Sequence, residues 1–341
     1  MGYTWEIALA AVFIEGIIFI ILSLLNIREL IIRSIPLVLK RAISIGIGLF
    51  IGTIGLINSG VIVRGEVFSQ LGDVSSPSVL LTFISIIIMG VLIVRKVQGA
   101  LMLGMLITTG VALLMGVVVI PDGFSPVSTP NSLEPIFMKM DFSQLFSLDM
   151  LVIIFILIYA DLFDTAGTLF AVCSRSGLVD KDGNVYRAKQ AFLSDAIATT
   201  FGAMVGTSSV TSYIESTTGV AAGGRTGMTA VVTGILFLLA LFISPILLLI
   251  PTAATSAVLV VVGLFMISSI SEIDFSDYKN SLPAFITIIF IPYTYSISQG
   301  IVYGFLSYVI IRVMTGKFRD ISFIMYILAL MFVLKEFFVG S

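Results

Sequence analysis

Apolar runs of about 20 residues, separated by glycine, proline or charged residues, follow one another along the whole chain. An α-helix of that length crosses the hydrocarbon core of a bilayer, whereas a lipid-facing barrel strand would alternate apolar and polar residues. The pattern therefore predicts membrane-spanning helices. They are expected near residues 4–26, 36–59, 78–95, 98–119, 148–173, 190–205, 228–249, 252–271, 282–295, 297–315 and 321–338.

The helical pattern is interrupted between residues 206 and 224. Gly206 precedes a polar stretch from Thr207 to Ser209, and a short segment around Glu215 then leads to a glycine-rich turn at 223–227. Glycine and short hydroxyl side chains favour extended or turn backbone. We predict a broken membrane element here, with an ordinary polar loop outside the bilayer as the alternative. The turn lacks the GK[ST] ending of a phosphate-binding loop and is predicted to be a connector.

The composition agrees with a chain surrounded by lipid. Hydrophobic residues make up 58% of it and charged residues 11%, with a mean hydropathy of +1.15. Soluble domains carry roughly a quarter charged residues. The predicted fold class is therefore an all-α polytopic membrane protein, with about eleven transmembrane segments present, one of them broken by a short extended stretch.

The missing residue types exclude several kinds of chemistry. The chain has no histidine and a single cysteine, Cys173, so a disulfide within the chain and a thiol metal cluster are excluded. Histidine is the commonest metal ligand and proton shuttle, so proton chemistry falls to carboxylates. No metal, cofactor or nucleic-acid partner is expected.

Lysine and arginine residues are unevenly distributed over alternate loops. If the 206–224 element crosses the membrane, fifteen of the eighteen fall on one side, and only Arg64, Lys139 and Lys335 fall on the other. The positively charged side is cytoplasmic. The distribution favours a crossing element, because every later loop would otherwise change sides.

An internal repeat is present at an offset of 215 residues. Ile35-Pro36, Ala42 and residues 48–50 (GLF) recur as Ile250-Pro251, Ala257 and residues 263–265 (GLF). By the loop assignment the two copies run in opposite directions, which predicts an inverted repeat of the kind found in secondary transporters. Chance similarity between leucine-rich helices is the alternative. The earlier copy has almost nothing before residue 16, so we expect its opening helices to be absent.

Acidic residues within the apolar spans need an explanation, because each costs about 2.5 to 3.5 kcal/mol on translocon-insertion scales. Asp161 lies roughly 20 Å along its helix, near the bilayer centre, and Asp164, Thr165 and Thr168 share its face. Two acids one turn apart, with no base on the same helix, make a candidate for proton coupling. The alternative is that they only tie helices together by hydrogen bonds. For Glu15 two interpretations are equally favoured: it ties two helices together by a hydrogen bond, or it lies next to the site.

Glu215 lies in the broken element. Free backbone groups at such a break are tolerated in a membrane only beside a cavity, where they can bind a ligand.

Three segments together resemble a known family. They are residues 161–168 (DLFDTAGT), 207–216 (TSSVTSYIES) and 219–227 (GVAAGGRTG). Over essentially its whole length the chain is similar to the AzgA-type adenine, guanine and hypoxanthine permeases of the nucleobase:cation symporter-2 (nucleobase/ascorbate transporter) family.

The resemblance implies fourteen transmembrane segments in two inverted repeats of seven, divided into core and gate domains. The core would comprise residues 1–27 and 148–249, the gate 36–119 and 252–315, with an extracytoplasmic loop at 120–147 and a C-terminal helix at 321–338. In this scheme the first three segments are absent, so the chain would be a fragment, a late-start reading or a decayed gene product. Transport by this chain alone is then an open question.

The resemblance also implies the site. Asp161 and Glu215 match acids that bind the base, Asp164 matches a second functional acid, and Thr165 occupies the place of a histidine in pyrimidine relatives. The predicted substrate-binding residues are Asp161, Glu215, Phe163, Ile214 and Ser209. The predicted proton-coupling residues are Asp164, Asp161 and Thr165.

The predicted function is purine uptake by proton symport, by a multi-pass protein of the cell membrane that is not an enzyme. The expected partners are a purine base, the lipid bilayer and, as a candidate, a second copy of the chain in a homodimer. A sulfate or other anion transporter of the same architecture is one alternative, although acids would repel its substrate. An intramembrane aspartyl protease is another, but it needs its acids on facing helices.

Overall fold

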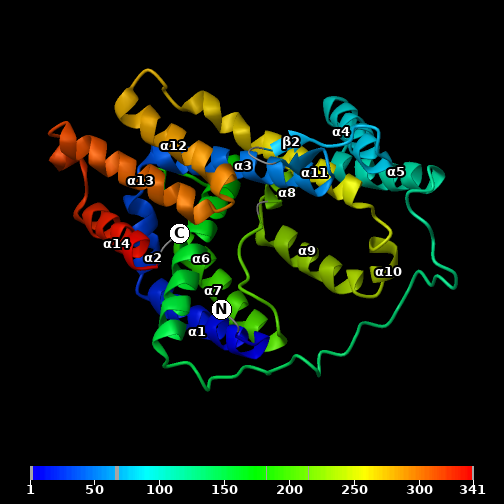
Figure 1. Ribbon diagram of the computed structural model, residues 1–341, viewed down its shortest axis with the longest axis horizontal. Helices are drawn as coiled ribbons and strands as arrows, with labels where there is room; N and C mark the ends of the chain where they lie inside the picture. Colours follow the sequence, from blue (N-terminus) through cyan, green and yellow to red (C-terminus); the bar gives the residue numbers. More distant parts are fainter. Residues whose placement is uncertain (1–2, 66–68, 182, 214, 340–341) are drawn as a thin grey trace. The chain divides into compact units, whose positions relative to one another are not determined.

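The computed structural model describes residues 3–65, 69–181, 183–213 and 215–339 (Figure 1). Within these residues the regular secondary structure is helical, apart from one two-stranded antiparallel sheet and an isolated bridge between Val179 and Val185. The backbone forms two compact units. The first comprises Met1–Ile47, Ser132–Ile214 and Ser269–Ser341, and the second comprises Gly48–Asn131 and Glu215–Ser268.

The first unit is built around α1, α6 and α7. Helix α1 lies along α7 and also against α6, α13 packs on α6, and α12 packs on α13 (Figure 1). The helices of this unit are α1 (Trp5–Leu24), α2 (Ile27–Ser34), the first part of α3 (Leu37–Asn58), α6 (Leu148–Ser176), α7 (Ala188–Val205), α12 (Tyr278–Thr294), α13 (Ile297–Met314), the 3-10 turn Phe318–Asp320 and α14 (Phe323–Val339).

The ends of α6 are fixed by local sequence. The Ser147 hydroxyl accepts a hydrogen bond from the Met150 amide at the start, and Gly177, with a φ of 70°, takes the left-handed conformation that ends the helix. The 29 residues between them extend about 43 Å, which exceeds the hydrocarbon core of a bilayer. Asp161 consequently lies close to the middle of the helix.

Helices α1 and α7 approach closely because Gly16 has no side chain. A Cβ atom added to Gly16 would lie 2.8 Å from the backbone nitrogen of Thr200 on α7. We expect Gly16→Ala to destabilise the protein by about 1 to 3 kcal/mol, because the α7 backbone cannot move aside without loss of packing. Thermal unfolding in detergent measures this effect.

A matched control is available in α4. A Cβ atom added to Gly90 would meet nothing within 4 Å, so Gly90→Ala replaces a helical glycine without a clash and is expected to leave stability unchanged or slightly raised. Equal melting temperatures for the two variants would contradict the close approach at Gly16.

The second unit holds the remaining elements. Helix α4 packs on α5 and α11, and Leu81, Ala112 and Ala253 form part of the buried contact. The elements are the last part of α3, β1 (Ile62–Arg64), β2 (Ser69–Leu71), α4 (Pro77–Val94), α5 (Ala100–Leu114), α8 (Ser216–Ala221), α9 (Gly227–Ala240), α10 (Ser244–Leu247), α11 (Thr252–Ile267) and the 3-10 turn Ser268–Glu272.

Equivalent glycines of the internal repeat face each other in this unit. A Cβ atom on Gly48 of α3 would lie 2.8 Å from the Gly263 carbonyl oxygen, and one on Gly263 of α11 would lie 2.5 Å from the Gly48 carbonyl oxygen. Such a reciprocal contact is what a two-fold relation between two segments produces on its axis. Small residues at the contact allow the two backbones to approach closely, as is common between membrane helices.

The predicted helices are present, but two of the predicted runs differ clearly in extent, and one helix and one hairpin were not predicted. The run predicted to 249 is divided into α9 and α10, because Pro245 cannot donate to the helical ladder. The run predicted to 119 ends at Leu114, shortly before Gly116 with its φ of 69°. Helix α2 and the β1–β2 hairpin were not predicted, because both are too short to produce a clear periodic pattern.

Six of the helices in the described residues are long and apolar enough to cross a membrane. They are α1, α3, α4, α6, α11 with the turn that follows it, and α13. The protein is therefore an all-α polytopic membrane protein. The core and gate domains are defined by their function, and the division of the chain into them remains a prediction. The two compact units are defined by packing alone.

Candidate functional site

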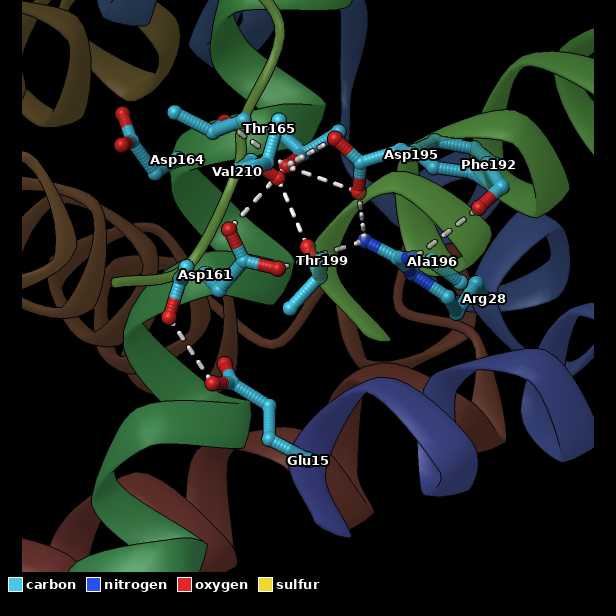
Figure 2. A network of polar contacts seen from close by, with 12 residues as sticks. Glu15, Arg28, Asp161, Asp164, Thr165, Phe192, Asp195, Ala196, Thr199 and Val210 are labelled. Atoms are coloured by element: carbon cyan, nitrogen blue, oxygen red, sulfur yellow. Dashed lines mark hydrogen bonds and ion pairs between the residues drawn. The ribbon is translucent and has the colours of Figure 1, made fainter. Parts of the chain in front are cut away.

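A buried cluster of charged and hydroxyl side chains lies inside the first unit (Figure 2). Helix α6 contributes Asp161 and Thr165, α7 contributes Asp195, α1 contributes Glu15, and α2 contributes Arg28. Glu15, Arg28 and Thr165 have no exposed surface, and the two aspartates are 7% exposed. Buried charges of this kind are costly in a membrane protein and mark functional regions.

Arg28 supplies the positive charge of the cluster. Its Nη2 donates to Asp195 Oδ2 at 3.1 Å and lies 3.9 Å from Asp161 Oδ2, and its Nη1 donates to the Phe192 carbonyl oxygen at 3.3 Å. The guanidinium also lies over the Phe19 ring, 3.9 Å from its centroid. Arg28 thus bridges α2, α6 and α7, and its closest ion pair is with Asp195.

The hydroxyl of Thr165 lies at the centre of the cluster. Its Oγ1 is 3.4 Å from Asp161 Oδ1, 3.3 Å from Asp195 Oδ2 and 3.0 Å from the Thr211 hydroxyl (Figure 2). A hydroxyl has one hydrogen to donate, so Thr165 can satisfy only one of these acceptors at a time. Its hydrogen bond can pass between the two carboxylates as their charges change.

Residues 207–213 form an extended segment that lies along the cluster. Helix α7 ends at Gly206, whose φ of 92° favours glycine, and the chain turns back so that Thr199 Oγ1 donates to the Val210 carbonyl oxygen at 2.7 Å. Thr211 contacts Thr165 as described above. The predicted break in the helical pattern is confirmed by this segment, and hydroxyl groups hold it in place.

Glu15 contacts the same segment. Ser209 Oγ donates to Glu15 Oε2 at 2.9 Å, whereas Glu15 Oε1 is buried and has no hydrogen-bond partner in the described part of the chain. Ser209, one of the predicted substrate-binding residues, therefore contacts an acid of α1. This contact links α1 to the extended segment.

Two other predicted residues lie apart from this network. The Asp164 carboxyl receives none of the contacts drawn in Figure 2, and its Oδ1 is buried without a hydrogen-bond partner in the structure described. Phe163 is 1% exposed and packs against the rings of Tyr159 and Phe332, at centroid distances of 5.2 Å and 5.3 Å. In this structure the Phe163 ring contacts other aromatic rings and not the polar cluster, because it is on the opposite side of α6 from Asp161.

The remaining two predicted residues are not part of the described cluster. Glu215 precedes α8 and belongs to the second unit, and Ile214 is outside the described residues. Their part in the site therefore remains a prediction.

Arg28 and Asp195 were missed by the reasoning from sequence. Arg28 is one of the fifteen basic residues assigned to the cytoplasmic side, and Asp195 does not stand out because α7 has a weak apolar pattern. Asp195 could have been recognised, since an acid within a predicted membrane helix needs a buried partner.

No group of three or more acids and cysteines among the described residues is arranged to hold a metal ion.

A solved structure shares this fold. The transmembrane domain of a cyanobacterium bicarbonate transporter, BicA, aligns with a TM-score of 0.60 over 87% of this chain and 77% of that one, at 15% identity. The protein has membrane-spanning helices, a broken segment and a buried charged cluster beside that segment. These features define its class, which is that of multi-pass membrane transport proteins.

The family follows from sequence similarity. Residues 1–303 match the profile of the Permease family of xanthine and uracil permeases, and the chain belongs to this family. Adenine permease AdeP of Escherichia coli is 40% identical over 342 residues, which cover 100% of this chain and 76% of that protein. Guanine/hypoxanthine permease PbuG of Bacillus subtilis is 41% identical over 334 residues, covering 97% and 75%. The protein is a multi-pass protein of the cell membrane.

Proposed function

We propose that this protein takes up purine bases, namely adenine, guanine or hypoxanthine, together with protons. The observation that carries the proposal is that relatives about 40% identical over nearly the whole chain are adenine and guanine/hypoxanthine permeases. The bilayer surrounds the protein and the purine is its ligand, so no covalent chemistry is required of it.

The buried acids support a ligand that donates hydrogen bonds. Asp161 Oδ2 accepts no hydrogen bond in the described structure and lies 3.9 Å from Arg28. A carboxylate oxygen in this position can accept a ring N–H of a purine, which is a strong charge-assisted bond inside a protein. In the proposal Asp161, Glu215, Phe163, Ile214 and Ser209 contribute to the substrate site.

Proton coupling is assigned to the polar face of α6. Asp161, Asp164 and Thr165 lie within one turn, and Thr165 can transfer its hydrogen bond between Asp161 and Asp195 as either acid gains a proton. The cluster holds more carboxylates than positive groups, which disfavours an anionic substrate. Sulfate is therefore a poor candidate for transport by this site.

Uptake of radiolabelled purines tests the proposal. Cells that lack their own purine permeases and express this chain are expected to take up hypoxanthine or adenine with saturation, and a protonophore is expected to abolish accumulation. Excess unlabelled purine should compete, and excess sulfate should not. Saturable uptake of labelled sulfate that is unaffected by purines would overturn the proposal.

A further inference from the structure

Glu15 differs from Asp161 and Asp195 of the buried cluster in forming no ion pair within the described residues. Asp195 and Asp161 both lie within 4 Å of the Arg28 guanidinium, at 3.1 Å and 3.9 Å. Within the described residues, the hydrogen bond of the Glu15 carboxyl comes from a neutral group, the Ser209 hydroxyl, which lies 2.9 Å from Oε2. The Glu15 side chain is completely buried, and its Oε1 has no hydrogen-bond partner there.

The charges around Glu15 do not balance. The titratable groups that face it are Arg28 from α2, Asp161 from α6 and Asp195 from α7, and residues 207–213 bring no acidic or basic side chain. One guanidinium thus stands against three carboxyl groups, and it is nearest to Asp195. A lone ionised carboxylate in a dry interior is strongly unfavourable unless it is paired or neutralised.

We infer that Glu15 binds one of the transported protons. The proton occupies a Glu15 carboxylate oxygen while residues 207–213 lie against α1, as in this structure, and it leaves to water when the segment moves away. The step requires no other bond to form or break. This inference rests on the proposed proton symport and adds a proton site on α1 to the acids of α6.

Ser209 connects this proton to the ligand. It belongs to the extended segment whose next two residues, Val210 and Thr211, are held by Thr199 and Thr165. A ligand that contacts the segment or Asp161 therefore acts on a network that ends at Glu15. Ser209 is the one polar partner of Glu15 in the described structure. A shift of Ser209 therefore changes the environment of Glu15 more than it changes the environment of the acids paired with Arg28.

Infrared spectroscopy of the purified protein tests whether Glu15 carries a proton. The carbonyl stretch of a protonated carboxyl group is separate from the bands of a carboxylate. At neutral pH, Glu15→Gln is expected to remove one such band, whereas Ser209→Ala should shift it, because the hydrogen bond is lost. Glu6→Gln in the first turn of α1 is the matched control and should leave the band in place. A spectrum of Glu15→Gln with every protonated-carboxyl band retained would overturn the inference.

Proteoliposomes test the coupling separately. A pH gradient of one unit drives about tenfold accumulation for each coupled proton. The quantity to compare is gradient-driven hypoxanthine accumulation divided by hypoxanthine exchange. Because Glu15→Gln would lose one coupled proton, this ratio should fall about tenfold. Glu6→Gln should keep the wild-type ratio. An unchanged ratio in Glu15→Gln removes Glu15 from the coupling. If the wild-type protein exchanges no purine, the proposed function fails, and the infrared result still decides whether Glu15 holds a proton.

Discussion

Replacement of Asp161 by asparagine is expected to abolish purine uptake while leaving membrane insertion intact. The asparagine side chain has the same shape, but it places an N–H₂ donor where a carboxylate oxygen would accept a ring N–H of the base. Losing a hydrogen bond to a charged group and leaving buried groups unpaired costs about 3 kcal/mol, or roughly a hundredfold in uptake at low substrate concentration. Initial rates of hypoxanthine uptake, normalised to the protein in the membrane, measure the change.

Asp149→Asn provides a matched control on the same helix. Asp149 is exposed in the first turn of α6, and its carboxylate lies 3.5 Å from the Tyr3 hydroxyl. Removing this charge is expected to leave uptake unchanged, because exposed interactions of this kind contribute little. Normal uptake by Asp161→Asn would remove Asp161 from the substrate site.

The second large effect is expected at Arg28. Replacing it with methionine leaves Asp195 buried without its cation and removes the positive neighbour of Asp161. Breaking a buried ion pair in this way costs about 3 to 5 kcal/mol, because an uncompensated charge remains. We therefore expect Arg28→Met to lower the apparent free energy of unfolding in detergent by that amount.

Two further variants make this prediction specific. The double variant Arg28→Met with Asp195→Asn removes both charges and should recover much of the lost stability, because no lone charge is left at that position. Arg33→Met, on the same helix, removes an exposed arginine that pairs with Glu29 and should change stability by less than about 1 kcal/mol. Equal unfolding of Arg28→Met and Arg33→Met would mean that the Arg28 ion pair is not important for the fold.

The helices could be predicted because lipid imposes a simple condition on sequence. A span needs about 20 apolar residues and must satisfy its own backbone hydrogen bonds, so apolar runs and glycine or proline interruptions indicate the elements. The break after Gly206 was predicted on the same grounds and is confirmed. Helix α2 was not predicted, since its eight residues contain two arginines and a glutamate and have no apolar run of membrane length.

The individual site residues were only partly predictable. Asp161 stands out because an acid in an apolar run is unusual at any position, and Thr165 follows it one turn later on the same face. The structure brings both into the buried cluster. Phe163, two residues away, was predicted to bind the substrate, and this stays a prediction, since the structure shows only that its ring packs on other aromatic rings. Its partner Phe332 is 169 residues further along the chain.

The sequence by itself determined that this protein lies in a membrane, where its helices and its broken segment fall, and to which family it belongs. It did so because hydrophobic length, backbone satisfaction and local motifs are properties of contiguous residues. Only the tertiary structure decided which charges meet. Arg28 pairs with Asp195 across 167 positions of sequence, and Glu15 meets Ser209 across 194. Such pairs depend on how α1, α2, α6 and α7 pack, and no local pattern in any one of these helices contains that information.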